Sequence, residues 1–120
     1  MSLEFEAVVF TLYAYPKTIE TAVELVKKKD KLEHDYVGGY NMGDGVQVNT
    51  NLKLLSESLV DSKIKPSDVA TLEFTLWKTH EVDTDRMRQR MTKELGQYLK
   101  DHGLNSDDFE YDFDYGYQLG

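Results

Sequence analysis

The chain has 120 residues, no cysteine, and a formal charge of -8 with a pI near 4.8. This length predicts a single domain over residues 1–120, which the strands and helices predicted below make an α+β domain, and the lack of cysteine excludes disulfides and thiol catalysis. The negative charge argues against nucleic acid and anionic membranes as ligands, and it favours basic protein surfaces as partners.

A first strand is predicted over residues 4–15, which are rich in aromatic and β-branched side chains. Successive side chains of a strand point to opposite faces, so Phe10 and Leu12 share one face while Tyr13 and Tyr15 share the other. Apolar groups on both faces predict a central strand of a sheet.

A helix is predicted from Lys17 to about Lys29, with Thr18 as its cap. An ion pair of Glu24 with Lys28 is expected at i,i+4 spacing. The lysines at the end of this helix are favoured there by the helix dipole.

A second strand is predicted over residues 34–40, followed by a glycine-rich turn. The extended residues 46–48 come next, where a phosphate-binding loop would need a helix, so phosphate is not expected here. A helix over residues 51–62 has leucines at helical spacing.

A second central strand is predicted over residues 69–79, in which Glu73 to Trp77 nearly repeats the pattern of Val9 to Tyr13. Phe74 belongs to the same face as Phe10, and Trp77 belongs to the other face.

The longest helix is predicted over residues 83–102, with Thr84 or Asp83 as its cap, and ends at Gly103. Its first turns carry Arg86, Arg88 and Arg90, where the helix dipole disfavours positive charge. Arg90 can pair with Glu94. Arg88 lies on the apolar stripe, and we expect it to pair with a nearby carboxylate.

The last strand is predicted over residues 108–117, where aromatic and acidic side chains alternate strictly. The aromatic side chains are expected in the core. The acidic residues suit an edge strand, because charge blunts edge-to-edge aggregation. The acidic row contains Asp108, Glu110, Asp112 and Asp114.

Two β-α-β units separated by an inserted helix predict a ferredoxin-like, four-stranded antiparallel sheet with helices on one face. The first and third strands should be central, and both crossovers should be right-handed. The uncovered face would present Tyr13, Tyr15 and Trp77, with the acidic row at one margin. Alternatively, the loop at residues 41–48 or the inserted helix covers this face. Such a fold carries many functions and implies none.

The surface favours a non-enzymatic protein–protein interaction or assembly module that binds a protein partner or a second copy through the open sheet face. The alternative is an acidic inhibitor that mimics nucleic acid and blocks a basic nucleic-acid-binding protein, for which a phage source would fit. Alternate strand residues place carboxylates ~6.8 Å apart, comparable with phosphate spacing along DNA. The predicted partner-binding residues are Tyr13, Tyr15, Trp77, Asp108, Glu110, Asp112 and Asp114.

An enzymatic role is not expected. His80, Glu81, Asp83 and Asp85 lie between a strand and a helix, but no nucleophile has a matched base and no spacing fits a metal motif. No cofactor or metal is therefore predicted. The chain lacks a long apolar run and a secretory pattern at its start, so we expect a cytoplasmic location in the producing or infected cell.

Overall fold

The computed structural model describes residues 5–34, 45–51, 53, 64–78 and 83–119. Four strands form one antiparallel sheet in the order β2-β3-β1-β4, so β1 and β3 are central, as predicted. The α+β class and the four-stranded antiparallel sheet are confirmed. The strands are β1 (Phe5–Pro16), β2 (Gly45–Thr50), β3 (Ala70–Lys78) and β4 (Phe109–Leu119).

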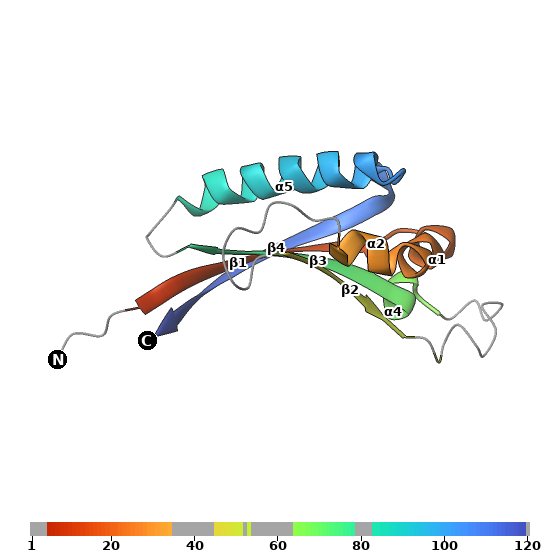
Figure 1. Ribbon diagram of the computed structural model, residues 1–120, viewed down its shortest axis with the longest axis horizontal. Helices are drawn as coiled ribbons and strands as arrows, with labels where there is room; N and C mark the ends of the chain where they lie inside the picture. The colour runs from red at the N-terminus through yellow and green to blue at the C-terminus, as the bar shows by residue number, and fades with distance from the viewer. Residues whose placement is uncertain (1–4, 35–44, 52, 54–63, 79–82, 120) are drawn as a thin grey trace.

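Three of the helices lie on the same side of this sheet, namely α1, α2 and α5 (Figure 1). The predicted inserted helix at 51–62 lies outside the described residues, except for Asn51, which has no regular structure, and Lys53, which is helical. The helical segments are α1 (Ile19–Lys27), α2 (Lys29–His34), α4 (Pro66–Val69), α5 (Thr84–Asp101) and the short 3-10 helix η1 (Ser106–Asp108).

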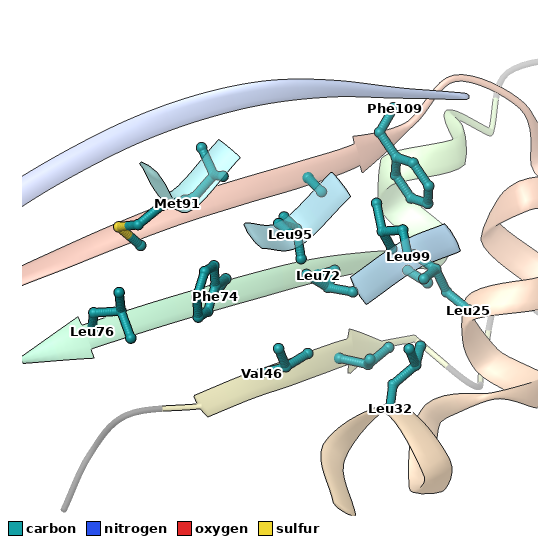
Figure 2. Packing of buried hydrophobic residues seen from close by; sticks show 14 of the residues in the cluster. Leu25, Leu32, Val46, Leu72, Phe74, Leu76, Met91, Leu95, Leu99 and Phe109 are labelled. Atoms are coloured by element: carbon teal, nitrogen blue, oxygen red, sulfur yellow. The ribbon is translucent and has the colours of Figure 1, made fainter. Parts of the chain in front are cut away.

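The core forms between the sheet and these helices (Figure 2). The strands carry apolar residues at alternate positions, and the helices carry them at helical spacing. Phe10, Phe74 and Leu72 are fully buried on the central strands, and each such side chain contributes about 1.5–3 kcal/mol by leaving water. The helices bring the matching apolar stripe. Its fully buried members are Leu25, Leu32, Met91, Leu95 and Leu99.

Strand register decides which side chains reach this core. Phe10 of β1 lies opposite Leu76 of β3 and Tyr115 of β4. A slip of one residue would turn Phe10 to the other face, so burial of the even-numbered β1 residues fixes the register.

Thr18 caps α1 as predicted, and Asp83, one of the two predicted candidates, caps α5. The Thr18 hydroxyl accepts the Thr21 N–H at 3.2 Å, and the Asp83 carboxylate accepts the Asp85 N–H at 2.9 Å. The negative charge of Asp83 offsets the unfavourable positive charge of the arginines in the first turns of α5. Gly103 has φ 76°, the left-handed conformation predicted for it.

The lysines at the end of α1 act differently from the prediction. Glu24 lies 3.8 Å from Lys27 instead of pairing with Lys28. The Lys28 Nζ donates to the His102 carbonyl at 2.6 Å. This bond joins α1 to the C-terminal end of α5, where carbonyls lack helical partners and attract positive charge.

The strand predicted over residues 34–40 falls almost entirely outside the described residues. Its first residue, His34, ends α2, and the strand described between α2 and β3 is Gly45–Thr50, which includes the predicted extended residues 46–48. Helix α2 is held by tertiary contacts, because Leu32 is fully buried and its carbonyl accepts the Tyr98 hydroxyl. Neither contact is visible as a local sequence pattern.

The aromatic row of β4 enters the core at one end and leaves it at the other. Phe109 is buried, whereas Tyr115 and Tyr117 are 46% and 54% exposed. The prediction that the whole row is core is therefore wrong. An edge strand has a neighbour on one side alone, so its rings are covered less than those of β1.

The arginines of α5 form surface ion pairs. Arg90 lies 2.9 Å from Glu94, as predicted. Arg88 lies 3.9 Å from Asp85, so the expected pairing with a nearby carboxylate is present, but both side chains are exposed. Exposed pairs contribute roughly 0–1 kcal/mol.

Two glycines give opposite predictions for stability. In Gly96→Ala the new Cβ meets Ser106 Cβ at an ordinary 3.8 Å, while the helix interior gains the better helix former. We expect the free energy of unfolding to rise by about 0.5–1 kcal/mol. Gly103→Ala places a side chain at φ 76°, with Lys28 Nζ 3.3 Å from the new Cβ. This variant should lose about 1–2 kcal/mol. Urea unfolding measures the free energy of unfolding of both variants. Equal changes in the two variants would contradict the helical position of Gly96 and the left-handed conformation of Gly103.

Candidate interaction surface

The side of the sheet that faces away from α1, α2 and α5 is called the open face here. Its side chains alternate with the core positions, so β1 and β3 contribute half-buried residues and β4 contributes exposed ones. Gly45 to Val48 lie within β2 itself, so this part of the predicted covering loop is a strand at the margin of the face. The open face contains Val9, Thr11, Tyr13, Tyr15, Gln47, Asn49, Thr71, Glu73, Thr75, Trp77, Glu110, Asp112 and Asp114.

Tyr13 occupies the middle of the open face. It pairs with Glu73 of β3 on one side and with Asp112 of β4 on the other. Its ring stacks on the ring of Tyr15, with centroids 6.2 Å apart and planes 12° apart. The register therefore places an aromatic pair between two carboxylates, one from each neighbouring strand.

The carboxylates act on the tyrosines electrostatically. Partial burial raises the pKa of Tyr13, and the negative charges of Glu73, Asp114 and Asp112 raise it further. Partial burial also raises the pKa of Tyr15, with Asp112 and Glu73 as additional causes. A negative field disfavours the phenolate form. The same field favours a cation placed over these rings.

Trp77 shares the open face but does not join this aromatic pair. It lies opposite Val9, which precedes Tyr13 by four residues. Four strand residues span ~14 Å. The three rings that the sequence places on one face are therefore brought to the same face, but as two patches and not as one cluster.

The acidic row is divided in the same way. Glu110, Asp112 and Asp114 are exposed along β4, and none has an ion pair within the part of the chain that is described. Asp114 also accepts the Tyr115 N–H at 2.8 Å. Asp108 ends η1 and borders a groove of about 540 Å³ beside α1, on the helix side. It is thus set apart from the other three carboxylates.

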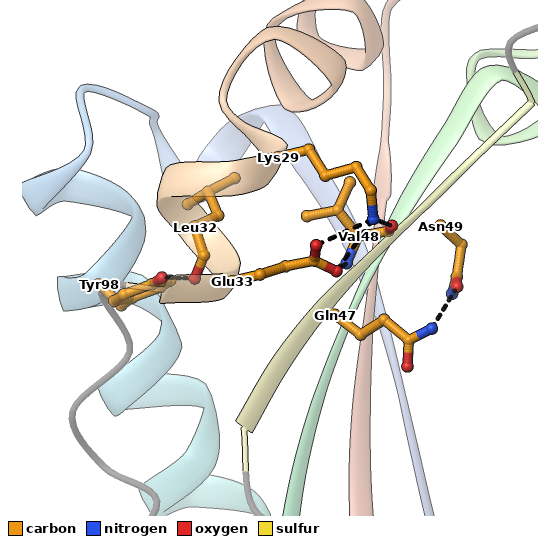
Figure 3. Close-up of polar contacts among 7 residues, drawn as sticks. All are labelled: Lys29, Leu32, Glu33, Gln47, Val48, Asn49 and Tyr98. Atoms are coloured by element: carbon orange, nitrogen blue, oxygen red, sulfur yellow. Dashed lines mark hydrogen bonds and ion pairs between the residues drawn. The ribbon is translucent and has the colours of Figure 1, made fainter.

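The opposite margin of the open face carries amide side chains that the sequence analysis did not single out. The Asn49 amide donates to Glu73 at 2.8 Å, and the Gln47 amide donates to Asn49 at 3.2 Å (Figure 3). These bonds orient the Glu73 carboxylate beside Tyr13. The alternation of polar and apolar residues over 45–50 is the signal that could have placed both amides on the face.

The candidate catalytic residues do not form a site among the described residues. Asp83 is occupied as the cap of α5, and His80 and Glu81 lie outside the described residues. Within the described ranges, no group of three or more His, Asp or Glu side chains could hold a metal ion. No described helix has both the length and the apolar character needed to cross a membrane.

No protein family, curated protein or solved structure matches the chain significantly. The chemistry of the open face is therefore the basis for inferring function. Stacked tyrosines flanked by carboxylates suit the binding of arginine or lysine side chains.

The pKa of Tyr13 should report the two flanking carboxylates. We expect Glu73→Gln and Asp112→Asn each to lower this pKa toward the ordinary value of 10.0, because removing a negative charge favours the phenolate. NMR titration of labelled tyrosine rings measures the shift. Glu24→Gln, on α1, serves as the control and should leave the pKa unchanged. A Tyr13 pKa insensitive to both changes would contradict the geometry.

Proposed function

We propose that the protein is a protein-binding module whose open face receives a cationic surface of its partner. The observation that carries this proposal is the position of Tyr13 between Glu73 and Asp112 in the strand register. Half-buried tyrosine is an effective interface residue, since the ring offers apolar area and the hydroxyl a polar tip.

The energetic case depends on combining two weak attractions. A cation over a tyrosine ring gains about 0.5–2 kcal/mol, more as water is excluded. Carboxylates on both sides of the ring add Coulomb attraction and orient the guanidinium or ammonium group. Asn49 holds Glu73 in place before binding, so less side-chain freedom is lost on association.

A second copy of the chain is a weaker candidate than a basic partner. Two open faces brought together would place carboxylates against carboxylates, in a chain whose net charge is -8. Tyrosine and Trp77 contacts would have to overcome this repulsion. We therefore expect a two-fold dimer only at high salt, where the repulsion is screened. Sedimentation at low and high salt measures the mass of the particle.

We also propose that the fold is ferredoxin-like. The support is that the strand order, read from the other edge, is β4-β1-β3-β2 with antiparallel pairs throughout. The central strands are the first and third, and α1 and α5 lie on the same side (Figure 1).

A second candidate function is inhibition of a basic nucleic-acid-binding protein by mimicry of nucleic acid. The observation that favours it is the exposure of Glu110, Asp112 and Asp114 at alternate positions of an edge strand. This spacing of ~6.8 Å follows from two strand rises. Binding would then depend on charge more than on the aromatic rings.

Site-specific crosslinking tests the module, and a chain without cysteine makes it straightforward. A photocrosslinker attached to Thr11→Cys or Thr75→Cys, both on the open face, should capture a partner from lysate of the source. The same group at Thr92→Cys, exposed on α5, is the matched control. Tyr13→Ala should weaken the captured complex about tenfold or more. Equal capture from Thr92, or no effect of Tyr13→Ala, would contradict the proposal.

Salt dependence separates the two candidate functions once the partner is captured. For mimicry, neutralising Glu110, Asp112 and Asp114 as Gln, Asn and Asn should abolish most of the salt dependence and most of the affinity. If the protein acts by mimicry, Trp77→Ala should have little effect on the affinity for the partner. For the module, Tyr13→Ala should cost more affinity than the triple neutralisation. Competition between the protein and duplex DNA for the partner provides the readout.

A further inference from the structure

The two edges of the sheet differ in which backbone groups remain available. In an antiparallel ladder, alternate residues direct both N–H and C=O toward the same neighbour. The Lys17 N–H donates to the Asp108 carbonyl, and the Asn51 N–H donates to the Val69 carbonyl, both at 2.9 Å. The even residues of β4 and the odd residues of β2 therefore face into the sheet. The odd residues of β4 and the even residues of β2 face outward.

The edge at β2 is blocked at Val48 by an ion pair from α2 (Figure 3). Lys29 pairs with Glu33 at 3.0 Å and donates to the Val48 carbonyl at 2.7 Å, while Glu33 accepts the Val48 N–H at 3.1 Å. Burial raises the pKa of Glu33, but the bonds from Lys29 and Val48 outweigh it and hold the pKa below its ordinary value. An added strand would have to displace this pair.

The edge at β4 is open by comparison. The strand runs over Phe109–Leu119 and pairs with β1 alone among the described residues. The outward N–H of Tyr115 is covered by its neighbour Asp114 at 2.8 Å. For Tyr111 and Phe113, the described residues supply no hydrogen-bond partner to the outward peptide groups. Such an edge is a template for an additional strand.

The two flanks of this edge have opposite chemistry. On the helix side, Phe113 stacks near Phe10 with centroids 6.1 Å apart, and the exposed rings of Tyr115 and Tyr117 continue the row. On the open face, Glu110, Asp112 and Asp114 occupy the alternate positions. A segment lying beside β4 would therefore meet aromatic rings with one set of side chains and carboxylates with the other.

We propose that the free edge of β4 binds an extended protein segment in which cationic and apolar residues alternate. Main-chain hydrogen bonds to the outward groups of Tyr111 and Phe113 hold the segment, and the two flanks select its sequence. Lysine or arginine side chains lie over Glu110 and Asp112, while apolar side chains pack on Phe113 and Tyr115. This site is the edge of the sheet: it shares Asp112 with the Tyr13 site of the proposed function but does not use the Tyr13 ring.

A second copy of β4 fits this edge poorly. Antiparallel pairing of two β4 strands about Phe113 would bring Asp112 of each copy opposite Asp114 of the other. Like charges directly opposite across a ladder are destabilising. The charge of the edge therefore selects a basic segment over self-pairing.

The test uses the full chain and a synthetic peptide of alternating lysine and valine. Amide hydrogen exchange should slow by about tenfold at Tyr111 and Phe113 when the peptide is saturating. The Val46 amide, on the other edge, should not change. Peptides of the same composition in block order, or of alternating glutamate and valine, should not protect these amides. Added salt should weaken the binding of the lysine–valine peptide.

Variants of the edge separate backbone pairing from side-chain contact. Tyr115→Ala and Tyr115→Pro both remove an exposed ring, but the proline ring also obstructs the outward side of the edge. We expect Tyr115→Pro to bind at least about tenfold more weakly than Tyr115→Ala. The double variant Glu110→Lys, Asp112→Lys should bind the glutamate–valine peptide in preference to the lysine–valine peptide. Both positions are exposed, so the fold should stay intact. Tyr13→Ala should bind as the parent chain does, which distinguishes this site from the open face.

Several results would overturn the proposal. They are protection that appears at Val46 or on the open face, equal binding by the two Tyr115 variants, and a dimer formed through β4 in the absence of peptide. The weak limit of specific binding is a dissociation constant of ~1 mM. If the lysine–valine peptide at this concentration does not protect the Tyr111 and Phe113 amides, the proposal is also overturned.

Discussion

The pairing of β1 with both neighbours is the constraint on which the structure depends. A single register places Phe10 between Leu76 and Tyr115 on the helix side, and Tyr13 between Glu73 and Asp112 on the open face. The same register sets the direction of every peptide group, and so decides which residues of β4 face outward. The core, the aromatic–acidic centre and the free edge are thus consequences of one alignment. Burial of Phe10 and Leu12 is what fixes that alignment.

The helix layer is attached to this sheet by polar side chains that reach backbone carbonyls far away in the chain. Lys28 bonds the His102 carbonyl, Tyr98 bonds the Leu32 carbonyl, and Lys29 bonds the Val48 carbonyl. Hydrogen bonds from charged donors contribute about 1.5–3 kcal/mol each. They fix α2 beside β2 and cover the Val48 peptide groups of that edge, whereas the outward groups of Tyr111 and Phe113 in β4 have no such partner among the described residues.

The acidity of the chain is distributed unevenly over this framework. Glu73 is oriented by Asn49, and Glu33 is neutralised by Lys29. Glu110, Asp112 and Asp114 remain without an ion pair in the part of the chain that the structure describes. Their mutual repulsion is a small cost to folding that a cationic partner would relieve. Both proposed interactions use this imbalance, one on the open face and one along the edge.

Periodicity alone determined the elements whose burial repeats regularly. Alternation over Val8–Tyr15 and Ala70–Trp77 marked the two central strands, and spacing at Met87, Met91, Leu95 and Leu99 marked the long helix. Local chemistry also specified the cap at Thr18 and the stop at Gly103, and it narrowed the cap of α5 to Asp83 or Thr84. In these stretches the intrinsic preference and the final environment agree, so the pattern was sufficient.

Tertiary structure alone decided the features that join distant parts of the chain. Lys28 found its partner 74 residues away, α2 formed over Lys29–His34, where no separate helix was predicted, and β2 formed at Gly45–Thr50. Trp77 was separated from Tyr13 by register, Asp108 was turned toward α1, and Tyr115 and Tyr117 were exposed by their place on an edge. No local period encodes such positions, because they follow from which strand lies beside which and from where a helix covers the sheet.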